Sequence, residues 1–383
     1  MIENPFKYGG VVRGPFFADR REELAELSRE MFNLNKVFLI SPRRFGKTSL
    51  LSNLLDELQE KGFGTAYIDL NAYTDLRAFA VGFTQSTSTA LETSTDKLVK
   101  MFAGMKRLRP RVQAGPGGEI SAGLEIPPAE KEAMPALIEG MRNAEELARR
   151  KKKKLIVVID EFSDLEKYDG RSVEKAFRSE VQQQDQIGYV FSGSEESVMI
   201  SMAKDRNRAF YRLGRIMELG PINRKEYLDF IYRWFQKGSY QVERRDLEPI
   251  IVQGRDVPYN IQRLCHVLWD SAQTDRRVTP ERIQTLPTIV AEQDSPHFEL
   301  LWRTATPQQK GLLSALSKEP EAKPFSRDFQ LSHGIGPSSS IKASLDSIVK
   351  KGILYKSKEG TYVFSDIFMQ HWILSVLQKG QLN

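Results

Sequence analysis

Residues 37–51 read VFLISPRRFGKTSLL, and this stretch decides the fold of the first half of the chain. The apolar run at 37–40 is short and bounded by polar residues, which predicts a buried strand rather than a helix. Leucines then recur from Leu50 to Leu58 at the spacing of one helical face, and Gly62 ends that pattern. A strand, a loop and a helix are therefore expected to follow one another directly.

The loop between this strand and this helix matches the phosphate-binding pattern GxxxxGK[ST] everywhere except its first position, where Ser41 replaces glycine. Backbone N–H groups of such loops surround a β-phosphate, and Gly46 permits that close approach. Lys47 is expected to bind the β- and γ-phosphates, and the Thr48 hydroxyl to ligate Mg²⁺. Because a Cβ disfavours a positive φ, Ser41 is expected to change the loop entry slightly. The predicted nucleotide-binding residues are Ser41, Pro42, Arg43, Arg44, Phe45, Gly46, Lys47, Thr48 and Ser49.

A pair of acids follows a second apolar strand. Residues 155–159 are wholly apolar and lead into Asp160 and Glu161. Ligands of open α/β sheets bind at the carboxyl ends of the strands. Asp160 is therefore expected to orient Mg²⁺ through its water shell, and Glu161 to polarise an attacking water. Two adjacent carboxylates at the end of a buried strand are costly without a cation, which argues against a purely structural role.

Strands alternating with helices predict an α/β core with a parallel sheet. The strands are expected at 37–40, 65–70, 155–159, 189–192 and 216–219. Downstream, a wholly helical stretch precedes short helices that end in one hairpin, a pattern typical of a winged helix. The predicted domains are a core at 1–222 with a hairpin-bearing insertion at about 95–135, a helical lid subdomain at 223–298, and a winged helix at 299–383.

The core motifs together resemble the archaeal ATPase family of P-loop NTPases, within the STAND and AAA-related members of the catalytic-glutamate division. The segments that carry the resemblance are 17–24 (FADRREEL), 42–51, 160–162, 192–194 and 214–215, and it covers roughly residues 4–280. It implies ATP rather than GTP, with Phe17 and Arg20 against the adenine. It also implies that Ser192 is a polar sensor and that Arg215 approaches the γ-phosphate, in its own subunit or across a subunit interface.

Residues 254–263 resemble the GxP segment of a helical lid. Pro258 is expected to start a helix there, and residues beside it to contact nucleotide. Arg263 is expected either to sense the γ-phosphate or to pair with an acid at the surface; both alternatives stay open.

Lys plus Arg outnumber Asp plus Glu by 56 to 50, which mildly favours an anionic partner. Six consecutive cations at 149–154 are expected to lie at the solvated end of the sheet, with nucleic-acid contact as the alternative. Arg107, Arg109 and Arg111 are candidate DNA contacts in the inserted hairpin. In the winged helix, the outer face of one helix and the wing are expected to contact a partner. Double-stranded DNA and a protein both stay open as that partner. These residues are Ser338, Ser339, Lys342, Ser344, Ser347, Lys356, Ser357 and Lys358.

Several classes of protein are disfavoured by composition. The single cysteine, Cys265, cannot form an internal disulfide, and four scattered histidines lack the spacing of a zinc centre. No apolar run approaches the roughly 20 residues of a membrane span, and no secretory signal is recognised at the start. A cytoplasmic protein is therefore expected.

These features together predict a Mg²⁺-dependent molecular switch that binds and hydrolyses ATP and couples its nucleotide state to DNA or a partner protein. Because Arg215 is expected to act in its own subunit or across a subunit interface, assembly into a homo-oligomer stays open. The alternative is a DNA-binding regulator in which nucleotide is only a structural ligand. A small-molecule kinase is less consistent with the sequence, which offers no obvious acceptor pocket.

Overall fold

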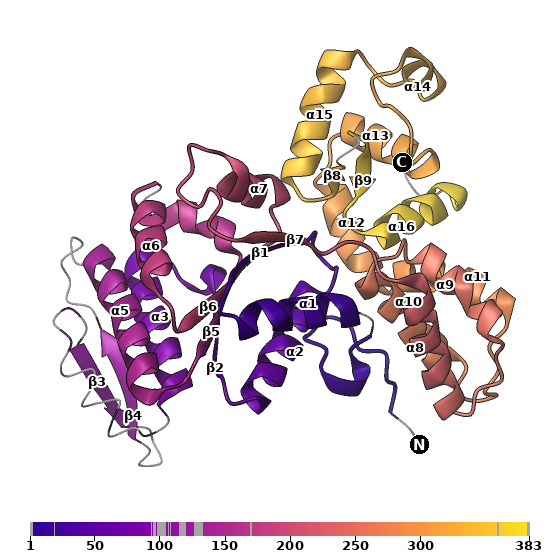
Figure 1. The fold of residues 1–383 in the computed structure, drawn as a ribbon. Coiled ribbons are helices and arrows are strands. Elements are labelled where there is room, and N and C mark those ends of the chain that lie inside the picture. The colour runs from indigo at the N-terminus through magenta and orange to yellow at the C-terminus, as the bar shows by residue number, and fades with distance from the viewer. Residues whose placement is uncertain are drawn as a thin grey trace. The chain divides into compact units, whose positions relative to one another are not determined.

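A computed structural model shows the chain as two compact units (Figure 1). One spans residues 11–222, and the other combines the N-terminal segment through Gly10 with residues 223–383. The structure describes residues 3–18, 20–92, 94, 97, 105, 107, 109–114, 120–125, 133–168, 171–357 and 360–380.

The N-terminal segment departs from the predicted core of 1–222, because it packs in the other unit. Phe6 is fully buried there, with its ring centroid 5.2 Å from that of Phe235 and 5.9 Å from that of Trp269. The side-chain amide of Asn4 donates to the carbonyl of His266. One isolated aromatic residue ahead of the first helix has no periodicity that could reveal this packing.

The first unit contains a five-stranded parallel sheet in the order β2-β5-β6-β1-β7. All five predicted strands are confirmed, within a few residues of the expected ends. They are β1 (Lys36–Ile40), β2 (Gly64–Asp69), β5 (Leu155–Asp160), β6 (Ile187–Gly193) and β7 (Arg215–Glu218). Because every strand runs the same way, the carboxyl ends of β1, β5 and β6 meet at one edge of the sheet.

Helices cover both faces of this sheet (Figure 1). One face packs against α1 (Arg21–Phe32) and α2 (Lys47–Glu60). The other packs against α3 (Leu76–Leu91), α5 (Ala133–Lys151), α6 (Arg171–Gln183) and α7 (Glu196–Lys204). The inserted hairpin is confirmed as antiparallel strands β3 (Arg109–Ala114) and β4 (Ile120–Glu125), whose connecting turn lies outside the described residues.

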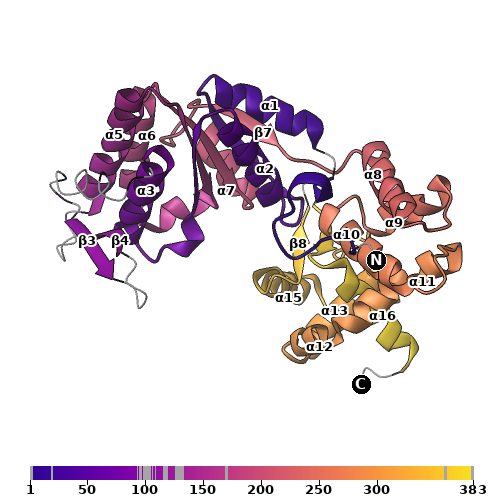
Figure 2. The ribbon, with the colours of Figure 1, turned by 90° about the horizontal axis from the view of Figure 1, so that it is seen from below.

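The second unit begins with helices, as predicted, and ends in a winged helix (Figure 2). Its first helices are α8 (Arg224–Lys237), α9 (Glu248–Gln253), α10 (Pro258–Ser271) and α11 (Pro280–Gln293). The later elements are α12 (Ser295–Arg303), α13 (Pro307–Lys318), α14 (Arg327–Ser332), α15 (Ser338–Lys350), β8 (Leu354–Lys356), β9 (Tyr362–Phe364) and α16 (Ile367–Gln378). Helix α16 packs on both α11 and α13, and therefore joins the two groups of helices. Within the described ranges, no helix has the length and apolar character needed to cross a membrane.

Candidate active site

The loop between β1 and α2 has the backbone of a phosphate cradle. Arg44 and Gly46 adopt left-handed conformations, with φ of 72° and 84°, and an added Cβ at Gly46 would meet nothing within 4 Å. The strained backbone, rather than the lack of space, therefore accounts for the glycine. Ser41 has no positive φ, is fully buried, and donates its backbone N–H to the carbonyl of Gly193. Serine at the loop entry thus costs no backbone strain.

Lys47, the first residue of α2, contacts both Asp160, which ends β5, and Glu161, which follows it. Its Nζ is 2.6 Å from Oδ1 of Asp160 and 2.9 Å from Oε1 of Glu161. Lys47 and Asp160 are both buried, so the cation offsets the cost of placing two carboxylates at a buried strand end. Burial alone would raise the pKa of Asp160, but Lys47 and the hydrogen bonds that the carboxylate accepts hold this pKa below its usual range.

Neighbouring strands fix each carboxylate. The Ser192 hydroxyl of β6 donates to Oδ1 of Asp160 at 2.6 Å. Ser194 donates both its backbone N–H and its hydroxyl to Oε2 of Glu161, at 3.1 and 2.9 Å. The structure thus brings Lys47, Ser192 and both acids into one cluster, and it adds Ser194, for which the sequence analysis assigned no contact.

Tyr67 of β2 is a further member of the cluster that sequence reasoning missed. Its hydroxyl donates to Oδ2 of Asp160 at 2.5 Å and is hydrogen-bonded to the side chain of Thr48. Burial, and after it the charge of Asp160, raises the pKa of Tyr67 well above its usual range, so the phenol stays protonated. Strand periodicity was the signal that could have revealed this residue. Tyr67 lies two residues before Asp69 and therefore points to the same face, and Asp69 pairs with Asp160.

The donor set of this cluster fits Mg²⁺. No described residues form a group of three or more His, Cys, Asp or Glu side chains able to hold a metal ion. A threonine hydroxyl and one carboxylate instead suit a hard cation that keeps several waters and takes its remaining ligands from phosphates. Thr48 and Asp160, which meet at the Tyr67 hydroxyl, are the residues that would hold it.

Arg20 is placed behind the phosphate loop rather than free beside it. The residue is 2% exposed, and Nη2 donates to the carbonyls of Gly220 at 2.7 Å and Phe45 at 3.4 Å. The guanidinium therefore connects Phe45 of the loop to Gly220, which follows β7. Phe17 is half-buried and packs against the core beneath α1 and α2. Its predicted contact with the adenine stays a prediction.

The structure does not bring Arg215 to the phosphate loop. Arg215 pairs with Val37 at the start of β1, whereas the loop follows Ile40 at the opposite end of that strand. Its guanidinium forms ion pairs with Glu26 and Glu30 of α1. The expectation that Arg215 approaches the γ-phosphate of its own subunit is therefore wrong, because the side chain lies at the amino-terminal edge of the sheet.

The two lid residues lie in the second unit. Pro258 starts α10, as predicted, and its contact with nucleotide stays a prediction. Arg263 is 5% exposed, is ion-paired with Asp294, and lies over the rings of Tyr8 and Phe368 at 5.3 and 5.1 Å. Its charge is thus compensated inside its own unit, which favours a structural role over sensing of the γ-phosphate.

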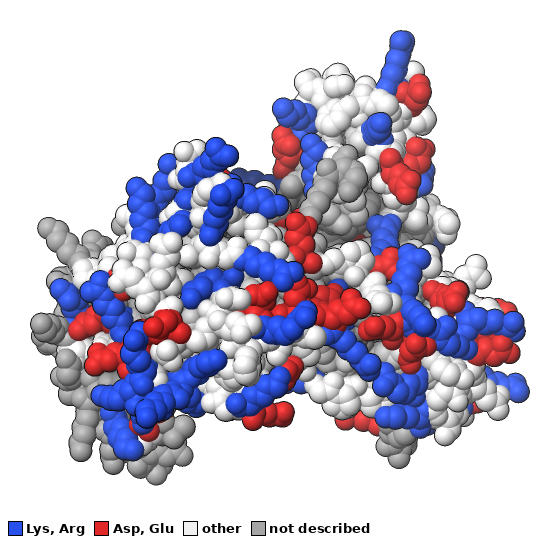
Figure 3. Space-filling view, in the orientation of Figure 1, with Lys and Arg blue, Asp and Glu red and all other residues white. Residues whose placement is uncertain are grey.

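The cationic run at 149–154 is largely engaged within its own unit. Lys151 is ion-paired with Glu92, and Lys154 lies 4.9 Å from the ring centroid of Phe32. These contacts favour the structural interpretation of the run. On the face drawn in Figure 3, described Asp and Glu side chains lie among the Lys and Arg side chains over much of the surface, whereas Lys and Arg predominate near α7. The side chains of Arg109 and Arg111 lie outside the described part of the structure.

Two family comparisons match most of the chain. Residues 17–253 match the family described as an ATPase domain predominantly from Archaea, and residues 296–375 match a probable winged helix domain. No curated protein matches the sequence.

Solved structures share the fold over nearly the whole chain. The Walker-type ATPase PABY2304 of Pyrococcus abyssi is 17% identical with a TM-score of 0.63, and the match covers 97% of this chain and 99% of that one. The Aeropyrum pernix ORC2 protein, with ADPNP and ADP, is 11% identical with a TM-score of 0.58, covering 98% of each chain. The Aeropyrum pernix ORC1 protein in complex with DNA is 14% identical with a TM-score of 0.51, covering 94% and 92%.

At such identities these structures show a shared fold alone. The family match, by contrast, spans more than half of the 383 residues and contains the phosphate loop, both acids and Ser192. The chain therefore belongs to the family of ATPase domains found predominantly in archaea, and it carries a winged helix domain after its ATPase domain.

Proposed function

We propose that the protein is a Mg²⁺-dependent ATPase that acts as a molecular switch. The observation that carries this proposal is the contact of Lys47 with both Asp160 and Glu161 at the mouth of a phosphate cradle. A triphosphate in the cradle offers Lys47 a more highly charged partner than either carboxylate. Binding would therefore draw Lys47 towards the β- and γ-phosphates and uncover Oε1 of Glu161.

In this proposal Glu161 orients the attacking water. Ser194 keeps its two hydrogen bonds to Oε2, so the carboxylate stays oriented when Lys47 leaves Oε1. The uncovered oxygen can accept a hydrogen bond from a water and orient it towards the γ-phosphate. Mg²⁺, when bound, supplies positive charge that neutralises the phosphate oxygens. Because Ser192 donates to the same oxygen of Asp160 that Lys47 contacts, one short cluster links the phosphate loop, β5 and β6.

Phosphate release from purified full-length protein, with and without Mg²⁺, tests this function. The wild type should hydrolyse ATP only with Mg²⁺, and Lys47→Ala should abolish hydrolysis. Equal hydrolysis by the wild type and by Lys47→Ala would overturn the proposal. ATP binding without turnover would instead favour the alternative, a DNA-binding regulator in which nucleotide is a structural ligand.

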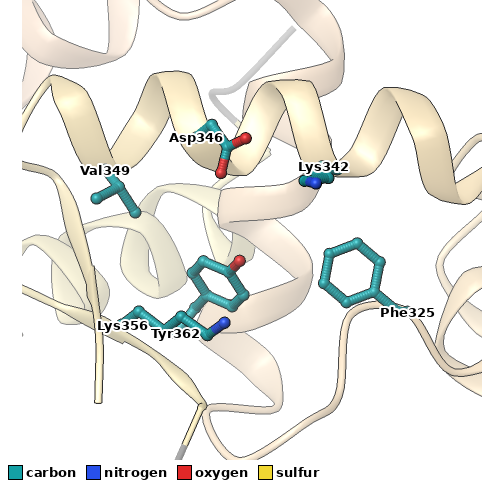
Figure 4. Close-up of a pocket in the computed structure, with 6 residues that line it drawn as sticks. All are labelled: Phe325, Lys342, Asp346, Val349, Lys356 and Tyr362. Carbon is teal, nitrogen blue, oxygen red and sulfur yellow. The ribbon is translucent and has the colours of Figure 1, made fainter. Parts of the chain in front are cut away.

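Duplex DNA is the partner that we propose for the winged helix. The proposal is supported by the similar fold of the ORC1 protein, whose structure was solved in complex with DNA. Helix α15 offers less to DNA than the sequence predicted. Ser344 is buried, and Lys342 lies on the rim of a cleft of about 340 Å³ opposite the hairpin (Figure 4). An exposed carboxylate, Asp346, lies one turn further along the same side of the helix.

The mixed charge of this cleft permits a sharp test of the partner. If α15 and the wing contact phosphates, Lys342→Gln and Lys356→Gln should each weaken binding of a labelled duplex and reduce the salt dependence by about one phosphate contact. Asp346→Asn should strengthen binding. Unchanged DNA affinity in all three variants would place the DNA contact elsewhere, and no DNA binding at all would favour a protein partner. Assembly into a homo-oligomer stays a prediction, tested by whether turnover per subunit rises with protein concentration.

A further inference from the structure

The hydroxyl of Tyr67 joins the two residues assigned to Mg²⁺. It donates to Oδ2 of Asp160 at 2.5 Å, and it is also hydrogen-bonded to the side chain of Thr48. The other carboxylate oxygen, Oδ1, is 2.6 Å from both the Ser192 hydroxyl and Nζ of Lys47. These side chains come from β2, β5 and β6 and from the first turn of α2, which meet at the carboxyl edge of the sheet.

The position of Tyr67 in β2 explains this reach. Tyr67 pairs with Val158 of β5. Two residues further along, both strands end, and there Asp69 pairs with Asp160. Its ring packs against the core beneath α1 and α2, so the side chain lies on the face from which α2 begins. A side chain of this length can extend from there to the end of the neighbouring strand, whereas a shorter one could not.

The direction of each hydrogen bond follows from the chemistry of the groups. A neutral phenol has one hydrogen, and Tyr67 donates it to the Asp160 carboxylate, which can only accept. The contact between Thr48 and Tyr67 must then use the hydrogen of the Thr48 hydroxyl. With its hydrogen turned towards Tyr67, the Thr48 oxygen presents lone pairs on its remaining side, which is the orientation that a metal ligand requires.

We propose that Tyr67 is a positioning residue for Mg²⁺, which orients the Thr48 hydroxyl and the Asp160 carboxylate at the same time. This inference rests on the proposed function and goes beyond it, since it assigns a role to a residue outside the phosphate loop and the acid pair. Groups that orient metal ligands in this way typically contribute about 10- to 100-fold to metal affinity.

Nucleotide binding with and without metal tests the assignment independently of turnover. Calorimetry with ADP gives one dissociation constant in Mg²⁺ and another in EDTA. The constant in EDTA divided by the constant in Mg²⁺ reports how much the metal strengthens binding. Tyr67→Phe keeps the ring and removes both hydrogen bonds. It should lower this ratio by about 10-fold or more while leaving the constant in EDTA unchanged.

Tyr189→Phe is the matched control. Tyr189 is a buried sheet tyrosine of β6, paired with Lys36 at the other end of the sheet, and its hydroxyl donates to Gln184. This variant loses a buried tyrosine hydrogen bond but should keep the wild-type ratio. A wild-type ratio in Tyr67→Phe would overturn the inference, and so would an equal loss of affinity with and without metal. If the wild type bound no ADP under either condition, the proposed function itself would fail.

Discussion

Nζ of Lys47 lies 2.9 Å from Oε1 of Glu161, so the cation expected on the phosphates and the carboxylate expected on the attacking water neutralise one another. One ammonium cannot serve both partners at full strength once a triphosphate is present. Under the proposed function, nucleotide binding and exposure of Glu161 are therefore coupled through a single side chain. Before nucleotide binds, Lys47 therefore neutralises the negative charge of Glu161.

Glu161→Gln should bind ATP as tightly as the wild type but hydrolyse it at least 100-fold more slowly, because the amide cannot accept a proton. Binding is measured by calorimetry and turnover by phosphate release. Glu195→Gln makes the same change at an exposed position nearby and should leave turnover unchanged. Undiminished hydrolysis by Glu161→Gln would show that another group orients the water.

Arg20→Ala should loosen the phosphate loop from behind. The change leaves the carbonyls of Gly220 and Phe45 without a donor in a buried place, which should cost about 1–3 kcal/mol of unfolding free energy. Nucleotide affinity should fall with it. Arg21→Ala, at the exposed neighbouring position, is the control for urea unfolding and for calorimetry. Equal stability of both variants would refute the supporting role of Arg20.

Arg215→Ala should leave turnover per subunit at the wild-type value. The side chain is 55% exposed and pairs with Glu26 and Glu30 at the amino-terminal edge of the sheet. Phosphate release is measured over a range of protein concentrations. A loss of turnover that appears only at concentrations where subunits associate would reverse this conclusion and identify an action across an interface.

The residues that the sequence placed correctly are those at strand ends within contiguous motifs. Asp160 ends the apolar strand β5, and Lys47 follows the apolar strand β1 after one short loop. Parallel strands bring such ends together. Tyr67 was missed because it lies inside a strand, where only its place on the same face as Asp69 points to the site. Arg215 was misplaced because the resemblance supplied a role without saying at which end of β7 the residue lies.

Interactions between distant segments were also beyond local sequence patterns. Phe6 reaches the core of the second unit, and Arg263 lies over the rings of Tyr8 and Phe368. Each contact joins residues separated by about a hundred positions or more, whereas helix and strand periodicities report only neighbours along the chain. Element types could therefore be predicted, but the partners of buried cations and of the N-terminal segment could not.

The second unit should lose stability in mild acid through His371. Burial, and after it the charge of Arg255, lowers the pKa of His371 below its usual range. A histidine with a lowered folded pKa binds more protons when unfolded, so its contribution is complete near pH 7 and is lost as pH falls below about 6.5. His371→Gln should reduce the fall in urea midpoint between pH 7 and pH 5. His297→Gln, at an exposed position, should not; the same fall in all three proteins would exclude His371 as the cause.

Arg263→Met should separate the structural role of this residue from the sensor role. Removing the guanidinium leaves Asp294 without its partner, and buried pairs cost about 3–5 kcal/mol when broken in this way. The side chain of Asp294 is 31% exposed, so we expect about 2–3 kcal/mol of unfolding free energy. Arg303→Met removes a largely exposed arginine paired with Glu299 and should change stability little.

A double change completes this test. Asp294→Leu in the Arg263→Met background removes the stranded carboxylate, and it should recover part of the lost stability because the pair disappears as a whole. A γ-phosphate sensor would behave differently. Its loss would weaken binding of a non-hydrolysable ATP analogue more than that of ADP, and Asp294→Leu would restore nothing. If Arg263→Met is fully stable but loses more affinity for the ATP analogue than for ADP, Arg263 contacts the nucleotide. If Arg263→Met loses stability that Asp294→Leu partly recovers, Arg263 stabilises the packing of the second unit.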